Sequence, residues 1–267
     1  MTTDLLPLPV LVAVVAGFGL LIGSFLNVVI IRVPQGRSVV TPRSACPTCD
    51  RPISGFDNVP VFSWLVLRGR SRCCDERISA RYPVIEAFTA VVFGAVAAWA
   101  GWSWDLPALL FLAAISIALA VIDYDVHRLP NAIVLPSYPV AAVLLTLAAL
   151  ADGEPGRLLS AAVGGIALYA FYFVLMFIYP SGMGFGDVKL GGVLGLYLGF
   201  YGWEEAVVGG FAAFVIGAVV GLGAIAFAGA TRKSMIPFGP FMLVGAWLGL
   251  IWGAGLVDWY LRLNGLR

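Results

Sequence analysis

Long apolar runs constrain this chain more than any other feature of its sequence. Hydrophobic residues make up 61% of the 267 residues and charged residues only 12%, whereas a soluble domain has roughly 25% charged residues. A run of about 20 apolar residues is long enough to cross a bilayer as a helix. Eight runs qualify as candidates: 9–31, 84–102, 106–122, 130–150, 158–179, 189–203, 206–228 and 239–261. The sequence therefore predicts an all-α polytopic integral membrane protein with about eight transmembrane helices, the run 189–203 being the shortest.

The positive charges are concentrated between the first and second runs. Residues 32–82 form the only sizeable polar region and contain nine arginines. If the eight runs alternate in direction, thirteen of the 16 Lys and Arg residues fall on the same side as this region. The positive-inside rule then places residues 32–82 in the cytoplasm and the N-terminus outside.

This pattern divides the chain into three parts. They are a first transmembrane helix at 1–31, a cytoplasmic cysteine-containing domain at 32–82 and a membrane-embedded domain at 83–267. The first run lacks the basic leading segment of a cleaved signal peptide, so we expect a retained helix. The net charge of +1 argues for neither a nucleic acid nor an acidic partner. The spacings Gly19–Gly23 and Gly191–Gly195–Gly199 indicate close packing of helices.

The segment 184–189, Gly-Phe-Gly-Asp-Val-Lys, places a carboxylate between two apolar runs. A charge in a membrane helix is costly, so Asp187 is a candidate functional residue. Gly184 and Gly186 allow the backbone to bend and another chain to approach closely, and we group Lys189 with them as residues that shape the site. An alternative is that Asp187 only caps the following helix.

A second carboxylate, Asp123, ends the uncharged run 106–122, and Asp125 is its local rival. The predicted topology puts Asp123 and Asp187 at the same membrane boundary. Two neighbouring carboxylates of this kind share one proton, so one can act as an acid and the other as a base. Such a pair could activate water against a peptide bond without a metal. The alternatives are two unrelated interfacial acids, or a metal site that pairs Asp123 with His127, which a single histidine makes unfavourable.

All four cysteines lie in the region 32–82: Cys46, Cys49, Cys73 and Cys74. In a reducing compartment, a CxxC motif with further cysteines about 25 residues later favours a zinc site over disulfides. The adjacent pair Cys73–Cys74 reaches one ion less easily than a second CxxC would. Four free thiols are therefore the alternative.

Several motifs occur in order along nearly the whole chain. They are Gly23-Ser-Phe-Leu-Asn27-Val-Val-Ile-Ile-Arg32, Cys46-Pro-Thr-Cys49, Asn58-Val-Pro-Val-Phe-Ser-Trp64-Leu, Arg68-Gly-Arg70, Ile78-Ser-Ala-Arg81-Tyr-Pro83-Val-Ile-Glu86, Asp123 to Leu-Pro-Asn131, Gly184-Phe-Gly-Asp187-Val-Lys189 and Pro237-Phe-Gly-Pro240-Phe. With these motifs the chain resembles the type IV prepilin peptidases, membrane aspartic proteases also called leader peptidase and N-methyltransferase enzymes. The resemblance implies that 83–267 is an aspartic peptidase domain with Asp123 and Asp187 as its catalytic residues. The chain departs from the family at Ser71-Arg-Cys73-Cys74, where a second C-x-x-C is expected.

The resemblance also implies the substrates and the setting. Prepilins and pseudopilins would lose a short basic leader at the cytoplasmic boundary of the bacterial inner membrane, and pilus or secretion machinery would be the wider partner. S-adenosylmethionine would be the methyl donor for the new N-terminus, with no metal at the aspartate pair. The residues that bind this donor are unknown, since no G-x-G-x-x-G follows a strand. A different class of function is a proton-coupled transporter that uses Asp123 and Asp187 as a relay, although a relay is expected nearer the membrane midplane.

Overall fold

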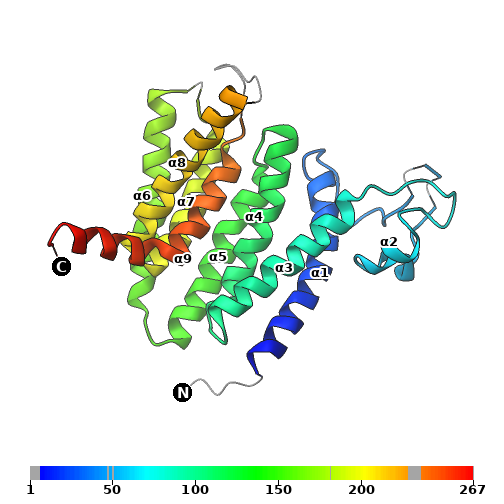
Figure 1. Ribbon diagram of the computed structural model, residues 1–267, viewed down its shortest axis with the longest axis horizontal. Helices are drawn as coiled ribbons and strands as arrows, with labels where there is room; N and C mark the ends of the chain where they lie inside the picture. Colours follow the sequence, from blue (N-terminus) through cyan, green and yellow to red (C-terminus); the bar gives the residue numbers. More distant parts are fainter. Residues whose placement is uncertain (1–6, 47, 50, 181, 228–235, 267) are drawn as a thin grey trace. The chain divides into compact units, whose positions relative to one another are not determined.

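A computed structural model describes the chain except residues 1–6, 47, 50, 181, 228–235 and 267. Every predicted apolar run is a helix (Figure 1). The helices are α1 (Leu8–Arg32), α3 (Arg81–Ala100), α4 (Leu106–Val126), α5 (Asn131–Ala151), α6 (Gly156–Ile178), α7 (Phe185–Tyr201), α8 (Trp203–Phe227) and α9 (Gly239–Leu263). Between α1 and α3 lie the 3-10 turn η1 (Gly55–Asn58) and the short helix α2 (Phe62–Val66). The predicted all-α membrane fold is confirmed.

Seven of these helices are long and apolar enough to cross a membrane, counted over the described residues. The remaining one is α7, the helix of the shortest predicted run, with 17 residues. At 1.5 Å per residue it is about 26 Å long, slightly less than the hydrocarbon layer of a bilayer. Most of its residues are buried, because neighbouring helices surround it.

The chain forms two compact units, residues 1–118 and 119–267, and the division falls within α4. In the first unit, α1 and α3 pack with their backbones close together. A methyl group on Gly23 would bring its Cβ to 2.7 Å from the Cα of Glu86, and one on Gly19 to 2.8 Å from the Cα of Ala90. The Gly19–Gly23 spacing therefore serves close packing, as predicted.

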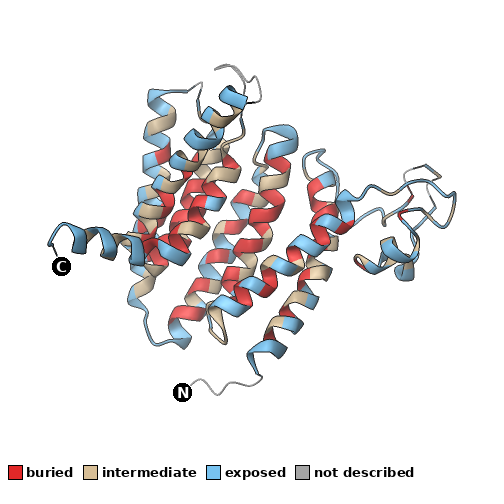
Figure 2. Ribbon diagram, in the orientation of Figure 1, coloured by how far each residue is buried: buried red, intermediate tan, exposed pale blue. Residues whose placement is uncertain are grey.

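The second unit contains two further pairs of closely packed helices. Gly195 and Gly199 of α7 lie against the backbone of Gly164 in α6, so no side chain separates these helices. Gly249 of α9 lies against Gly209 of α8 in the same way, with only 2.6 Å between its potential Cβ and the Cα of Gly209. Buried residues follow the faces on which the helices meet (Figure 2). These contacts fix the helix ends that carry the candidate site.

Candidate active site

Asp123 lies in the last turn of α4, and only 5% of its surface is exposed. Its Oδ2 atom accepts a hydrogen bond of 3.0 Å from the backbone N–H of Gly239, the first residue of α9. Any side chain at Gly239 would bring its Cβ to 2.7 Å from the same oxygen. Glycine is therefore needed for the start of α9 to hold this carboxylate.

Asp187 is the third residue of α7, and its Oδ2 atom accepts a hydrogen bond of 3.0 Å from the backbone N–H of Gly184. The capping contact that the sequence left open is therefore present, and it engages one carboxylate oxygen. Asp187 is also close enough to Asp123 for the two charges to interact. The fold thus brings together two carboxylates that are 64 positions apart in the sequence.

Asp125 and His127 differ from Asp123 in their surroundings. Both side chains are exposed, while Asp123 is buried. His127 has a positive φ of 53°, and its backbone N–H donates to the carbonyl oxygen of Asp123 at 2.9 Å, which ends α4. Asp123 is therefore the acid at the end of α4 that faces the interior of its unit.

Leu129, in the connection between α4 and α5, packs against two of the helix starts at this site. A Cβ on Gly186 would lie 3.1 Å from the Cβ of Leu129, and one on Gly239 would lie 3.2 Å from its Cδ2. The start of α7 and the start of α9 are thus both in contact with one side chain. Leu129 thus contacts the helix start that carries Asp187 and the helix start whose Gly239 N–H binds Asp123.

Lys189 connects α7 to α5. Its Nζ donates to Asn131 Oδ1 at 2.9 Å and lies 4.6 Å from the centroid of the Phe185 ring, while its carbonyl oxygen accepts from Tyr138 Oη at 2.7 Å. These contacts fix the first turn of α7 against the start of α5. The role of Lys189 in shaping the site stays a prediction.

Aromatic side chains line the unit close to Asp187. The buried Tyr172 of α6 interacts electrostatically with Asp187, and its ring packs against Gly191. It also lies against Phe214, at 5.8 Å between ring centroids, and Phe238, at 6.4 Å. Such apolar surroundings exclude water and strengthen electrostatic interactions.

The four cysteines belong to the first unit, and their sulfur atoms all lie within 4.8 Å of one another. Cys46 Sγ is 3.4 Å from Cys74 Sγ, and Cys49 Sγ is 3.1 Å from Cys73 Sγ. Zinc bound by four thiolates at about 2.3 Å needs sulfur atoms about 3.8 Å apart, so this cluster could bind a metal. The adjacent cysteines Cys73 and Cys74 both reach the cluster.

Two turns present these cysteines. One is closed by Cys46 N–H donating to Arg51 O at 2.9 Å, and the other by Ser71 N–H donating to Glu76 O at 2.8 Å. Ser71 Oγ lies 3.3 Å from Cys74 Sγ, at the edge of the cluster. Asp75 has a positive φ of 58° in the second turn, which contains Cys73 and Cys74.

Local contacts shift the pKa values of Cys46 and Cys73 in opposite directions. Backbone N–H groups of Thr48 and Cys49 lower the pKa of Cys46 to about 6. Contact with Cys49 Sγ raises the pKa of Cys73 to about 12. Cys46 is therefore the thiol of this pair that ionises more readily.

Comparison with known proteins agrees with this arrangement. A model of the bacterial peptidase A24 N-terminal domain matches residues 18–100, and a model of the type IV leader peptidase family matches residues 110–222. The prepilin leader peptidase/N-methyltransferase of Aeromonas hydrophila is 35% identical, with 91% of each chain covered. The enzyme of that name from Neisseria gonorrhoeae is 34% identical over 95% of this chain and 96% of its own. The chain belongs to the type IV leader peptidase family.

The residues matched by the two family models include both candidate sites. The N-terminal domain model contains all four cysteines, and the leader peptidase model contains Asp123 and Asp187. The latter ends before Gly239, although that residue holds Asp123. No solved structure matches the chain.

Sequence reasoning missed two residues that position the aspartates. Gly239 was noticed only as part of Pro237-Phe-Gly-Pro240, although a glycine between prolines at a helix start is a signal for close backbone approach. Leu129 gave no signal, because one leucine before a proline is ordinary in an apolar chain. Its role depends on a contact that only the fold creates.

Proposed function

We propose that this chain is a prepilin leader peptidase/N-methyltransferase, the name its relatives carry, and that Asp123 and Asp187 are its catalytic pair. The observation that carries the proposal is a buried carboxylate at the end of α4 whose charge interacts with a second carboxylate at the start of α7. Family membership favours this reaction over a proton relay. Burial supports Asp123 over the exposed Asp125 as the first member of the pair.

The two carboxylates can act as general base and general acid in hydrolysis. One is ionised and takes a proton from water as the water oxygen attacks the scissile carbonyl carbon, while the other is protonated and donates a hydrogen bond to the carbonyl oxygen. The C–N bond then breaks, and the amine leaves with a proton from the pair. Each Oδ2 is held by a backbone N–H, so each Oδ1 would face the water or the peptide.

The glycines of the site suit a peptide substrate. Gly186 lets the first turn of α7 approach Leu129. Gly184 is exposed and has no side chain, so the backbone directly before α7 is accessible and an extended segment could lie close to Asp187. We propose that this segment is the junction of a short basic leader and an apolar helix in a prepilin or pseudopilin. The concentration of arginines in 32–82 supports a cytoplasmic position for this boundary in the bacterial inner membrane. Pilus or secretion machinery would use the processed product.

The names of the relatives imply S-adenosylmethionine as a cofactor. This donor supplies an electrophilic methyl group for the new amino terminus. We tested the buried polar cluster of the first unit as its site. Glu86 there already accepts hydrogen bonds from Val61 N–H, Ser24 and Asn27, and Asn27 donates to Tyr82 O. These groups satisfy one another, so the cluster does not fit the donor.

The cysteine cluster supports a structural zinc site. Cys46, Cys49, Cys73 and Cys74 would hold the ion, and the spacing of their sulfur atoms fits a tetrahedron. Cys73 would take the place of the cysteine expected at Ser71. The ion would stabilise the segment between α1 and α3 and would take no part in peptide hydrolysis.

The reaction can be tested directly with the purified protein in detergent. A prepilin is incubated with and without S-adenosylmethionine, and the product masses are measured. We expect loss of the leader in both samples and one added methyl group only when the donor is present. An intact prepilin in both samples would contradict the proposed function, and cleavage without methylation would contradict only its second part.

A further inference from the structure

The segment between α1 and α3 exposes apolar side chains on one surface. We define the α2 surface as Phe56, Val59, Phe62, Leu65 and Val66. Their exposed fractions are 89%, 44%, 61%, 58% and 78%, in that order. This segment lies outside the helices that are long enough to span a membrane, so lipid chains around those helices do not by themselves cover it. A contiguous apolar patch of this kind marks an interaction site.

The exposed apolar residues of α2 share one face of the helix. Phe62, Leu65 and Val66 lie at positions i, i+3 and i+4 of α2 and so share one side of the helix. Trp64 points elsewhere, since its Nε1 donates to Ile78 O at 3.0 Å and its ring packs against Gly69. Phe62, Leu65 and Val66 are thus the exposed residues of α2, while Ser63 and Trp64 are partly covered.

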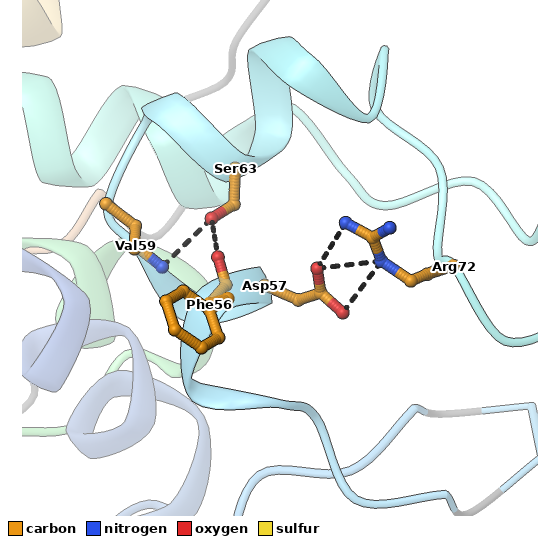
Figure 3. Close-up of polar contacts among 5 residues, drawn as sticks. All are labelled: Phe56, Asp57, Val59, Ser63 and Arg72. Carbon is orange, nitrogen blue, oxygen red and sulfur yellow. Dashed lines mark hydrogen bonds and ion pairs between the residues drawn. The ribbon is translucent and has the colours of Figure 1, made fainter.

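Hydrogen bonds beneath the surface hold its parts together. Ser63 Oγ accepts from Val59 N–H at 2.9 Å and donates to Phe56 O at 2.8 Å (Figure 3). An ion pair of 2.9 Å joins Asp57 to Arg72, beside the second pair of cysteines (Figure 3). Phe56 and Val59 are therefore fixed to α2 and to the cysteine segment.

A contact with α3 places α2 at the level of the membrane boundary. The backbone N–H of Val61, directly before α2, donates to Glu86 Oε2 at 2.7 Å. Val61 has a positive φ of 61°, which is unfavourable for a β-branched residue and persists only where surrounding contacts impose it. Glu86 lies five residues after Arg81, the first residue of α3, or about 8 Å along the helix axis.

The contacts of Glu86 with helix α1 indicate the same depth in the membrane. Glu86 also accepts hydrogen bonds from Ser24 and Asn27 of α1, and Asn27 lies five residues before Arg32, the last residue of α1. Helix α3 has 20 residues, about the 30 Å thickness of the hydrocarbon layer, so its first turns lie near the boundary. Interfacial helices lie about 5–10 Å into the zone between headgroups and acyl chains.

Charge around the α2 surface matches anionic lipid. Arg68 directly follows α2 and is exposed, and Arg51 and Arg77 are exposed elsewhere in the segment between α1 and α3. Apolar side chains bordered by arginines are typical of segments that bind membrane surfaces. Val84 and Phe88, in the first half of α3, are also exposed apolar side chains of this unit.

We propose that the α2 surface docks on the bilayer itself, with Phe62, Leu65 and Val66 among the lipid headgroups and the contact between Glu86 and Val61 setting their depth. The occupant is phospholipid, and the flanking arginines bind its phosphates. The cysteine segment is thereby held at the membrane plane. This inference stands without the proposed peptidase function, because it rests on α1, α3 and the segment between them.

The test places the photoreactive residue p-benzoylphenylalanine at Phe62 or Val66 of the full-length protein. The matched control is the same residue at Val40, an exposed apolar position in the same segment but outside the α2 surface. The protein is reconstituted in vesicles of phosphatidylethanolamine and phosphatidylglycerol and irradiated, and the adducts are identified by mass spectrometry. We expect phospholipid adducts at Phe62 and Val66, severalfold above those at Val40.

Other adducts would overturn the proposal. Crosslinks to a second copy, to an added prepilin, or to residues 119–267 in place of lipid would identify a different occupant. Equal lipid yields at Val40 would show that contact is not specific to the α2 surface.

The role of Glu86 is tested in the same vesicles. Glu86→Ala is expected to reduce the lipid adduct at Phe62 severalfold, whereas Glu76→Ala, an exposed acid of the same segment, leaves it unchanged. Glu86→Gln, which keeps an acceptor for Val61 N–H, is expected to restore most of the yield. An unchanged yield in Glu86→Ala would remove Glu86 from the proposal.

Discussion

The aspartate site and the cysteine cluster are assembled in opposite ways. Asp123, Asp187 and Gly239 come from the ends of three helices, far apart in the sequence, and are brought together by helix packing. The four cysteines lie within residues 46–74, on turns of a segment whose only α-helix in the described residues is α2. The first site is therefore a product of a packed fold, while the second could bind a metal, and such an ion would stabilise it. The two sites should respond differently to the same kinds of perturbation.

The largest effect is expected from the carboxylates themselves. Asp123→Asn and Asp187→Asn should each lower the rate of leader cleavage by about 10²- to 10⁴-fold, because each removes one partner of an acid/base pair. Asparagine keeps an acceptor for the backbone N–H of Gly239 or Gly184, so both variants should fold. Product masses from a prepilin measure the rate.

Asp125→Asn is the matched control for this pair. It alters an exposed acid two residues from Asp123 and should retain substantial activity. The assignment of Asp123 would be wrong if Asp125→Asn were inactive and Asp123→Asn active.

Gly239→Ala tests whether helix packing holds the site. The new Cβ would lie 2.7 Å from Asp123 Oδ2, so the carboxylate or the start of α9 must shift. A displacement of about 1 Å can cost about 10²-fold in rate. We expect a loss of that order, measured by the same assay.

Gly255→Ala serves as the control in the same helix. A Cβ at Gly255 meets nothing within 4 Å, and its rate should equal that of the wild type. Equal rates for Gly239→Ala and Gly255→Ala would show that α9 does not position Asp123.

Loss of the metal should affect the cysteine cluster and leave the aspartate site almost unchanged. The purified protein should contain about one zinc per chain, and Cys49→Ser should lose it because three thiolates remain. The segment between α1 and α3 should become more sensitive to protease, while cleavage of a prepilin in detergent should change little. Elemental analysis and limited proteolysis measure these effects.

Ser71→Cys decides whether Cys73 has replaced the expected ligand. If it has, Ser71→Cys should leave the zinc content unchanged. Absence of zinc in the wild type together with a full equivalent in Ser71→Cys would show instead that the chain has lost a metal site.

The smallest effect is expected where a single exposed hydrogen bond supports the aspartate site. Asn131→Ala removes the acceptor for Lys189 Nζ and should lower the free energy of unfolding by about 1 kcal/mol, with a severalfold lower cleavage rate. Asn264→Ala, which removes a hydrogen bond of 2.8 Å at the end of α9, should alter stability alone. Equal cleavage rates in the two variants would contradict a site-shaping role for Lys189.

Most of the helices were predictable because their apolar runs have about the length that a bilayer demands, whereas α7 is shorter. Asp123 and Asp187 were found because they interrupt or end such runs. The contact between Asp123 and Gly239 was not predictable, since it joins residues 116 positions apart and depends on how helices pack. The contact between Cys73 Sγ and Cys49 Sγ was not predictable from the spacing, because it joins two turns whose cysteines are 24 positions apart.

The contact between α6 and α7 restricts which substitutions can arise in this sequence during evolution. At Gly164, Gly195 and Gly199 the two backbones touch, and neither side has a side chain that a second substitution could shorten. A larger residue at any of these positions cannot be accommodated by a compensating change in its partner. A library of single substitutions should therefore tolerate almost nothing at these three glycines, while Gly221 and Gly223 of α8, which meet no neighbour within 4 Å, should accept alanine and serine freely.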